Sequence, residues 1–535
     1  MGWFQTILQA VAGSDRQPLA PLQALVINNA SEPESLDPHK TLGSAEQKIM
    51  GDLLEGLFIF DRHGEVVPGM ALYAYSPDKK SWSFHLRPGT KWSNGDKLDA
   101  HDFVYSWRRL ADPKTAAPKA ELLRTMKVAN IEAILAGKLP PEALGIKALG
   151  PLTLQLTLSK PLGFLKKLLV NSGLLPVHQA TIERYGEQWT QPTHWVGNGA
   201  YRLKKHVVNE KIVLIRNPHY WDNQHTTIDQ VTYLSLDEAT EIARYQTGDI
   251  DLTHTKVSSD LLKKLKKELI QELRRFPMPA FRGYQINITL PPFNDVRVRQ
   301  ALNLVLDRQA ILQQLCLVDQ LPTHHLVPDG LGGSALDQPN WALWSPAQRL
   351  ETAQALLQAA GYGPENPLKF TLLYPNSEAN KQLALVVCAL WQAYLGVETT
   401  LVHREWKVYL EETRLRNYQM AHLSFSTTGG DPYGLLGNQC SHSCDNETGY
   451  NNPNFDHWLE KALDCLHDTE RRSLYYKAEA QLAEDVPIIP LFHPVALRLV
   501  KPYVGGLSDR NPMNRFYTKD LYLTKHPLAP KKARQ

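Results

Sequence analysis

Four pairs of residues in this chain have types and spacings that could support catalysis or metal binding. In chain order they are Glu32 with Glu34, His101 with Asp102, His324 with His325, and Cys440 with Cys444. A catalytic acid pair needs a nucleophile or an environment that separates its two pKa values, and a zinc site needs three or four ligands. None of the pairs has such a partner nearby in the sequence. We therefore expect a protein that is not an enzyme and has no catalytic residue, metal or cofactor.

The cysteines bear on the compartment rather than on catalysis. Cys440 and Cys444 enclose a short polar segment, which favours a disulfide between them and hence an oxidising compartment. Two free thiols are the alternative. Cys316, Cys388 and Cys465 have apolar, helix-like surroundings, so we expect them to be buried thiols.

The composition is that of an ordinary globular protein. The chain has 535 residues, of which 43% are hydrophobic and 21% are charged, and its net charge is +3. A charge so small for this length argues against a nucleic-acid partner. The densest basic cluster, residues 263–267, alternates with leucines at near-helical spacing, so we interpret it as a solvated amphipathic helix.

Neither a membrane span nor an ordinary leader is visible in the sequence. The longest apolar run, residues 383–395, is shorter than the roughly 18 to 20 residues that a span needs, and we expect a buried core helix there. The first 13 residues are mildly apolar but lack a basic region and a clear cleavage pattern. We expect residues 1–24 to be a disordered N-terminus or leader, with a native signal peptide absent, trimmed or atypical.

Strand and helix patterns alternate along the chain. Leucine occupies every second position from Leu152 to Leu158, which predicts a half-buried strand, and residues 211–215 and 230–236 are further strand candidates. Residues 298–316 have apolar positions at helical spacing. The alternation predicts mixed α/β layers, and the length is enough for about three domains.

A series of short segments in one order carries more information than any single motif. The segments are residues 34–38 (ESLDP), 52–57 (DLLEGL), 82–87 (WSFHLR), 91–95 (KWSNG), 102–107 (DFVYSW), 217–222 (NPHYWD), 292–299 (PFNDVRVR), 405–407 (EWK) and 499–503 (LVKPY). In this order they resemble the oligopeptide-binding proteins of bacterial ABC importers, within the peptide/nickel-type extracytoplasmic solute-binding family. The resemblance runs from about Leu25 to His526.

The resemblance implies a two-lobed α/β periplasmic-binding-protein fold with an additional domain and a hinge between the lobes. Lobe I would comprise residues 25–54, 181–281 and 498–526, the additional domain residues 55–180, and lobe II residues 282–497. Residues 527–535 would be a tail. The implied function is that of a monomeric periplasmic receptor. It would capture peptides or peptide-like solutes by hinge closure and deliver them to a membrane permease.

The ligand-binding residues that the resemblance implies are Trp406, His422, Phe425, Thr428 and Asp431. In the family an aspartate anchors the peptide's α-ammonium, and this position falls on Thr428, whose hydroxyl supplies no countercharge. The usual tryptophan falls on Phe425 and a common basic residue on His422. Trp406 is available as a stacking wall or, alternatively, as a core residue.

The loss of the aspartate leaves three alternatives, because a buried ammonium needs an opposite charge. Asp431 could serve the ammonium, a peptide could be held by other contacts, or the ligand could lack a free α-amine. A receptor of the same fold for a non-peptide ligand, or a sensory ligand-binding module, is the alternative function.

Overall fold

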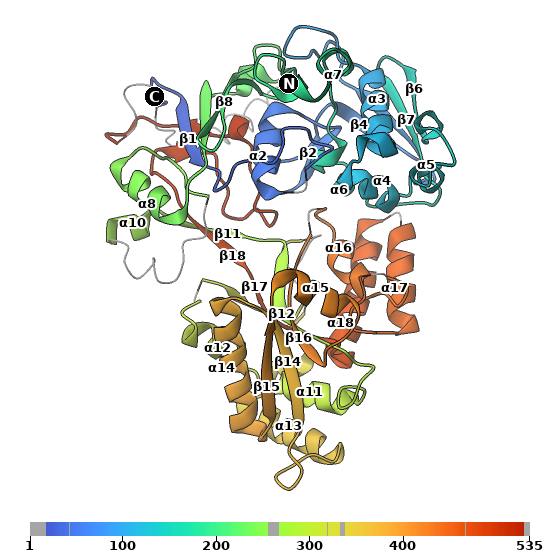
Figure 1. The fold of residues 1–535 in the computed structure, drawn as a ribbon, viewed down its shortest axis with the longest axis vertical. Coiled ribbons are helices and arrows are strands. Elements are labelled where there is room, and N and C mark those ends of the chain that lie inside the picture. Colours follow the sequence, from blue (N-terminus) through green and yellow to red (C-terminus); the bar gives the residue numbers. More distant parts are fainter. Residues whose placement is uncertain are drawn as a thin grey trace, which may run out of the picture.

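The protein forms two lobes, one above the other in Figure 1, joined by a narrow connection. The computed structural model describes residues 18–41, 43–254, 267–317, 319–331, 337–427, 429–443, 445–465 and 467–528. The upper lobe contains the early and middle parts of the chain together with its C-terminal end, and the lower lobe contains most of the later part. Among these residues, no helix is both long and apolar enough to cross a membrane.

Strands from distant parts of the chain build the main sheet of the upper lobe. β1 (Ala24–Asn28) pairs in parallel with β10 (Gln230–Leu234), which is followed by the antiparallel strands β9 (Lys211–Arg216) and β8 (Tyr201–Val207). The C-terminal part of the chain contributes β19 (Val504–Gly505) and β20 (Tyr522–Leu523), which pair with each other in a separate two-stranded sheet. Gln23 fastens this end, because its Nε2 donates to the Leu523 carbonyl at 2.9 Å. The helices α2 (Ser44–Leu53), α7 (Gln179–Tyr185), α8 (Glu238–Thr247) and α10 (Lys267–Gln271) also belong to the upper lobe.

A second, antiparallel sheet occupies the other side of the upper lobe. Its order is β4 (Ala71–Tyr75), β5 (Ser81–Leu86), β7 (Thr153–Thr157) and β6 (Ile146–Gly150). In β7, buried leucines alternate with half-buried polar residues, as the leucine pattern predicts. Helix α3 (Ala100–Ala111) lies beside this sheet and begins at a capping box formed by Asp99 and Asp102.

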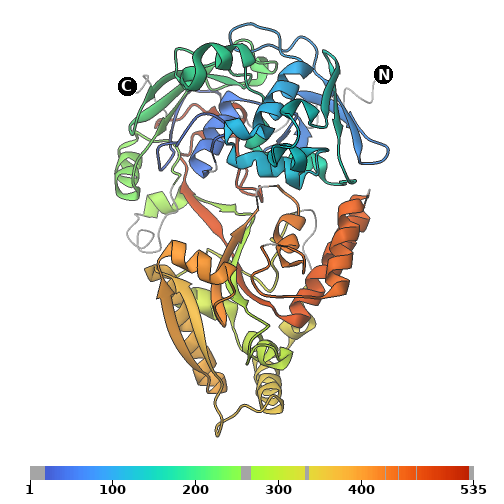
Figure 2. The ribbon, with the colours of Figure 1, turned by 45° about the vertical axis from the view of Figure 1, so that its right-hand side comes forward.

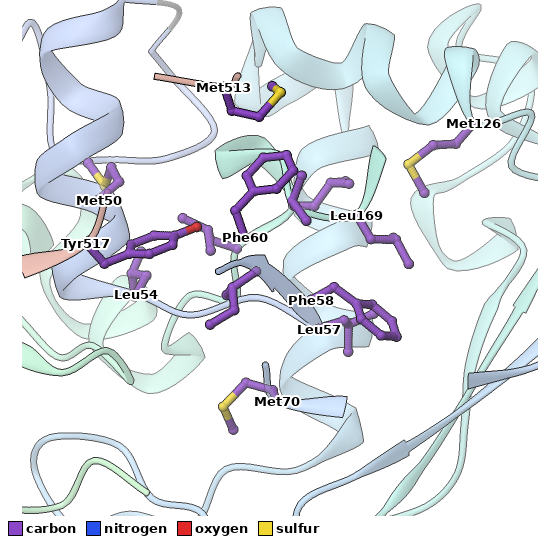
Figure 3. Packing of buried hydrophobic residues seen from close by; sticks show 14 of the residues in the cluster. Met50, Leu54, Leu57, Phe58, Phe60, Met70, Met126, Leu169, Met513 and Tyr517 are labelled. Atoms are coloured by element: carbon purple, nitrogen blue, oxygen red, sulfur yellow. The ribbon is translucent and has the colours of Figure 1, made fainter. Parts of the chain in front are cut away.

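One hydrophobic core unites the two sides of the upper lobe. Met50 from α2, Phe60 from the short strand β2 (Phe58–Phe60) and Tyr517 from the C-terminal part belong to the same cluster of buried side chains (Figure 3). Strand β2 pairs with β3 (Val66–Pro68). The core therefore holds together segments that are more than 450 residues apart in the sequence.

The lower lobe is a mixed sheet with helices around it. The strand order is β13 (Leu321–Pro322), β17 (Ile488–His493), β12 (Ala280–Ile286), β16 (Met420–Ser426), β14 (Lys369–Pro375) and β15 (Glu398–Arg404). Its helices include α11 (Val296–Leu304), α12 (Arg308–Gln314), α13 (Pro346–Ala359), α14 (Glu378–Leu395) and α15 (Trp406–Arg414). Figure 2 shows α17 (Pro453–Asp464) and α18 (Asp468–Asp485) standing together on one side of this lobe.

Two adjacent strands carry the chain between the lobes. β11 (Leu273–Pro277) and β18 (Val495–Leu499) pair antiparallel. The chain runs down from β11 into β12 of the lower sheet, and it returns from β17 of that sheet into β18 (Figure 1). Prolines interrupt both strands at the same level, because Met278, between Pro277 and Pro279, donates its N–H to the Pro494 carbonyl at 3.1 Å. Proline cannot donate to a ladder, and the β11–β18 pair and the lower sheet are separate ladders on the two sides of this level. The division into domains by residue number remains a prediction.

Two expectations from the sequence were wrong in detail. The helix expected over residues 298–316 is two helices, α11 and α12, separated at Asp307, which caps the second one. Cys316 is exposed rather than buried; it follows the end of α12 and has a positive φ of 56°. Cys465 is buried and Cys388 is half-buried. The amphipathic helix expected at residues 263–267 falls largely outside the described residues.

Candidate functional site

A hollow in the lower lobe brings together three of the five predicted site residues. It has a volume of about 450 Å³, and Trp406, His422 and Phe425 all line it. We call it the lower-lobe hollow. Its walls are strands β12 and β16, helix α15 and the segment after β16 that includes the short helix α16 (Tyr433–Leu436). Helices α15 and α16 lie at the end of this lobe that faces the upper lobe (Figure 1).

Trp406 is a wall of the hollow and not a core residue. It is the first residue of α15, which Glu405 caps by accepting a hydrogen bond from the Lys407 N–H. Its side chain is 56% exposed and stacks on Tyr409, with ring centroids 5.9 Å apart. A large exposed indole on a rigid helix offers an apolar face to a ligand at little entropic cost.

His422 forms a neutral part of the floor. It is buried in β16 opposite Tyr284 of β12, and their rings meet edge to face at 6.4 Å. Burial, together with the nearby charge of Arg282, lowers the pKa of His422 to about 3. The basic position of the resembling family is therefore occupied here by an uncharged imidazole at neutral pH.

Asp431 lies outside the hollow, where several protein groups already bind it. It is 2% exposed, and its carboxylate accepts hydrogen bonds from the Tyr475 hydroxyl at 2.6 Å and the Tyr433 N–H at 3.0 Å. Lys167 of the upper lobe pairs with it at 3.1 Å, and Arg471 lies 3.7 Å away. These partners supply the hydrogen bonds and the opposite charges that a buried carboxylate needs. The arrangement argues against Asp431 as a replacement for the missing ammonium anchor.

The other candidates from the sequence take structural roles or are not described. Thr428 and Cys444 lie outside the described residues, and Cys440 is a buried free thiol, so the expected disulfide gains no support. Glu32 accepts a hydrogen bond from the His206 ring at 2.6 Å. Among the described residues, no three His, Cys, Asp or Glu side chains are placed to share a metal ion.

Among the lining residues of the hollow that sequence reasoning missed is Arg282 on β12. It lines the hollow together with Trp406, His422 and Phe425. The strand register places it directly across from Ser424 of β16, whose side chain is exposed. An arginine within a strand whose other residues are all uncharged was the available signal, because a charge in such a position needs a reason.

Comparisons with known proteins agree with this architecture. The family model described as bacterial extracellular solute-binding proteins, family 5, matches residues 65–447. The periplasmic oligopeptide-binding protein OppA of Salmonella typhimurium is 44% identical over 509 residues, which cover 95% of this chain and 94% of that protein.

Two solved structures indicate which arrangement of the lobes is present. The unliganded open form of the periplasmic murein tripeptide-binding protein MppA superposes with a TM-score of 0.90 at 36% identity, covering 96% of this chain and 99% of that one. The Haemophilus influenzae OppA complex with the peptide RPPGFSPFR has a TM-score of 0.73 at 38% identity, covering 95% and 100%. Since the identities are nearly equal, sequence divergence does not explain the difference, and the lobes here are arranged as in the open form. The chain belongs to the family 5 bacterial extracellular solute-binding proteins, which have two lobes and an extra domain.

Proposed function

We propose that this protein is the periplasmic receptor of an ABC importer. It captures peptides or peptide-like solutes between its two lobes and delivers them, as a monomer, to a membrane permease. The names of its relatives, which include periplasmic oligopeptide-binding proteins, support this proposal.

The observation that carries the proposal is the hollow with its exposed tryptophan. A site on one lobe of an open two-lobed protein is only half of a binding site, because the facing lobe completes it on closure. A ligand that touches both lobes binds the closed form more tightly, and this difference in affinity shifts the equilibrium towards closure. The hollow is half-open and has aromatic and polar groups, which suits solutes with a polar backbone and variable side chains.

Native mass spectrometry of gently purified protein tests this proposal. We expect a ladder of bound masses that fragment as peptides. One discrete non-peptide mass would instead favour the alternative, a receptor of the same fold for another ligand. Bound masses should disappear after partial unfolding and refolding, which serves as the control for non-specific adducts.

Restoring the family's acid tests whether the amine anchor alone has been lost. Thr428→Asp adds a countercharge for an α-ammonium at the position that the sequence resemblance indicates. If the site otherwise binds peptides, calorimetry should show a gain in affinity for peptides with a free amine and none for N-acetylated ones. If Thr428→Asp bound free-amine and N-acetylated peptides with equal affinity, the proposal of a peptide site would be weakened.

A further inference from the structure

Arg282 has a position that its role in the fold does not explain. Its side chain is partly buried in the lower-lobe hollow, on the strand that leads directly from the crossing between the lobes. Among the described residues, the guanidinium has no carboxylate within ion-pair distance and no hydrogen bond. Burial without a partner is costly for a charge, and it lowers the pKa of Arg282.

Other enclosed arginines of this protein show what a partnered guanidinium looks like. Arg109 forms a bidentate pair with Asp37, with N–O distances of 2.6 and 3.1 Å. Arg299 donates to the carbonyls of Phe293 and Asp485, and Arg308 donates to the Pro490 carbonyl and to Asn303. The bonds of Arg299 and Arg308 fix the lower lobe from inside. Arg282 contributes no comparable bond, although it lies in the same lobe.

The charges around Arg282 leave it as the cationic group of the hollow. His422, its neighbour, is neutral because burial and Arg282 itself hold its pKa far below 7. No other lysine or arginine is among the described residues that line the hollow. Two acids also line the hollow, and each already has a partner: the Glu447 carboxylate accepts a hydrogen bond from Gln285 at 2.8 Å, and Asp445 is also engaged.

We propose that Arg282 binds a carboxylate of the transported solute, so that the ligand is selected by a negatively charged group in the lower-lobe hollow. This inference rests on the proposed receptor function and specifies its substrate class. A guanidinium presents two parallel N–H groups to a carboxylate, and the exposed Ser424 hydroxyl across the strand pair can donate a third hydrogen bond. The carboxylate can belong to the end of a peptide or to an acidic side chain.

Three short peptides distinguish these sources by calorimetry. The probes are trialanine, trialanine with a C-terminal amide, and Ala-Glu-Ala with a C-terminal amide. If the terminal carboxylate binds, the wild-type protein should bind trialanine at least about tenfold more tightly than its amide. If a side chain supplies the carboxylate, the wild-type protein should bind Ala-Glu-Ala amide about tenfold more tightly than trialanine amide.

Variants at position 282 test whether the arginine causes the preference for peptides that carry a carboxylate. Arg282→Gln should abolish the preference for the charged probe, and Arg282→Lys, which keeps the charge but loses the bidentate geometry, should retain part of it. Arg414→Gln is the matched control, because Arg414 is exposed on α15 and does not line the hollow. The proposal is overturned if the wild type binds all three peptides equally, or if Arg282→Gln keeps the preference.

A second measurement separates this proposal from the receptor function. Sodium acetate should raise the unfolding temperature of the wild type above its value in sodium chloride at equal ionic strength, and it should not do so for Arg282→Gln. If no peptide binds but acetate has this effect, the peptide function fails and the anion site stands. If acetate has no specific effect and the peptides bind without discrimination, the anion site fails and the receptor function stands.

Discussion

At the scale of single residues, exposure and pairing decide which side chains can bind a ligand. Trp406 and His422 line the same hollow, but the indole is 56% exposed whereas the imidazole is 5% exposed. Asp431 is surrounded by protein partners, so it belongs to the fold. The resemblance in sequence pointed to Trp406, His422 and Phe425, which line one hollow, but it could not distinguish an exposed tryptophan from a core one. That distinction depends on where α15 begins and on how it packs.

Trp406→Ala should weaken peptide binding without destabilising the protein. We expect a loss of about tenfold or more in affinity, because an aromatic anchor is removed from the wall of the site. The free energy of unfolding should change by less than about 0.5 kcal/mol, since the side chain is largely exposed. Calorimetry and urea unfolding measure the two effects.

Trp344→Ala is the control for this prediction, because Trp344 is 38% exposed in the same lobe and does not line the hollow. It should leave the affinity unchanged. Equal affinities of the wild type and Trp406→Ala would exclude Trp406 from the site.

At the scale of elements, contacts between distant parts of the chain hold together elements that the sequence pattern could only predict one at a time. The strands β7, β9 and β10 follow closely the runs that the sequence predicted as strands. Their partners could not be predicted from the sequence, because β1 and β10 are about 200 residues apart. The contact between the lobes at Asp431 also depends on Lys167, which lies 264 residues earlier.

Asp431→Asn should destabilise the protein and leave peptide affinity unchanged within about twofold. The change leaves Lys167 without its countercharge and Arg471 with Asp468 as its remaining one, and removing one member of a buried network costs about 3 kcal/mol. Urea unfolding measures this cost. Asp464→Asn, at the exposed end of α17, should cost little. A stable Asp431→Asn protein that no longer binds peptide would instead identify Asp431 as a ligand contact.

Glu479 of α18 should make stability depend on pH. It is 3% exposed, its carboxylate accepts hydrogen bonds from the Leu326 and Val327 N–H groups, and burial raises its pKa to about 8 from a usual value near 4.5. Between these values the unfolded chain loses the proton while the folded protein keeps it. The contribution of Glu479 to stability is therefore fully present below about pH 4.5 and falls as the pH rises to about 8.

Glu479→Gln should remove this part of the pH dependence. Relative to the wild type, the variant should gain about 3 kcal/mol of stability between pH 5 and pH 8. Glu484→Gln, an exposed position on the same helix, is the control and should follow the wild type. Parallel stability curves for the wild type and Glu479→Gln would show that Glu479 titrates normally in the folded protein.

At the scale of the whole molecule, the two crossing strands determine how the lobes can move. The prolines at residues 277, 279 and 494 interrupt both strands at one level, while the ladders above and below them continue. The order of family segments in the sequence was enough to predict two lobes, an extra domain and a hinge. It could not show that Arg282 would remain unpaired beside this crossing, because that depends on side chains from strands far apart in the chain.

The central claim is that this open protein closes over a solute. Small-angle X-ray scattering with and without a peptide that calorimetry has shown to bind is the most direct test, with Trp406→Ala at the same peptide concentration as the control. The account predicts that saturating peptide lowers the radius of gyration of the wild type, and that the weakened variant responds less. An unchanged radius of gyration at saturation would contradict capture by closure of the two lobes.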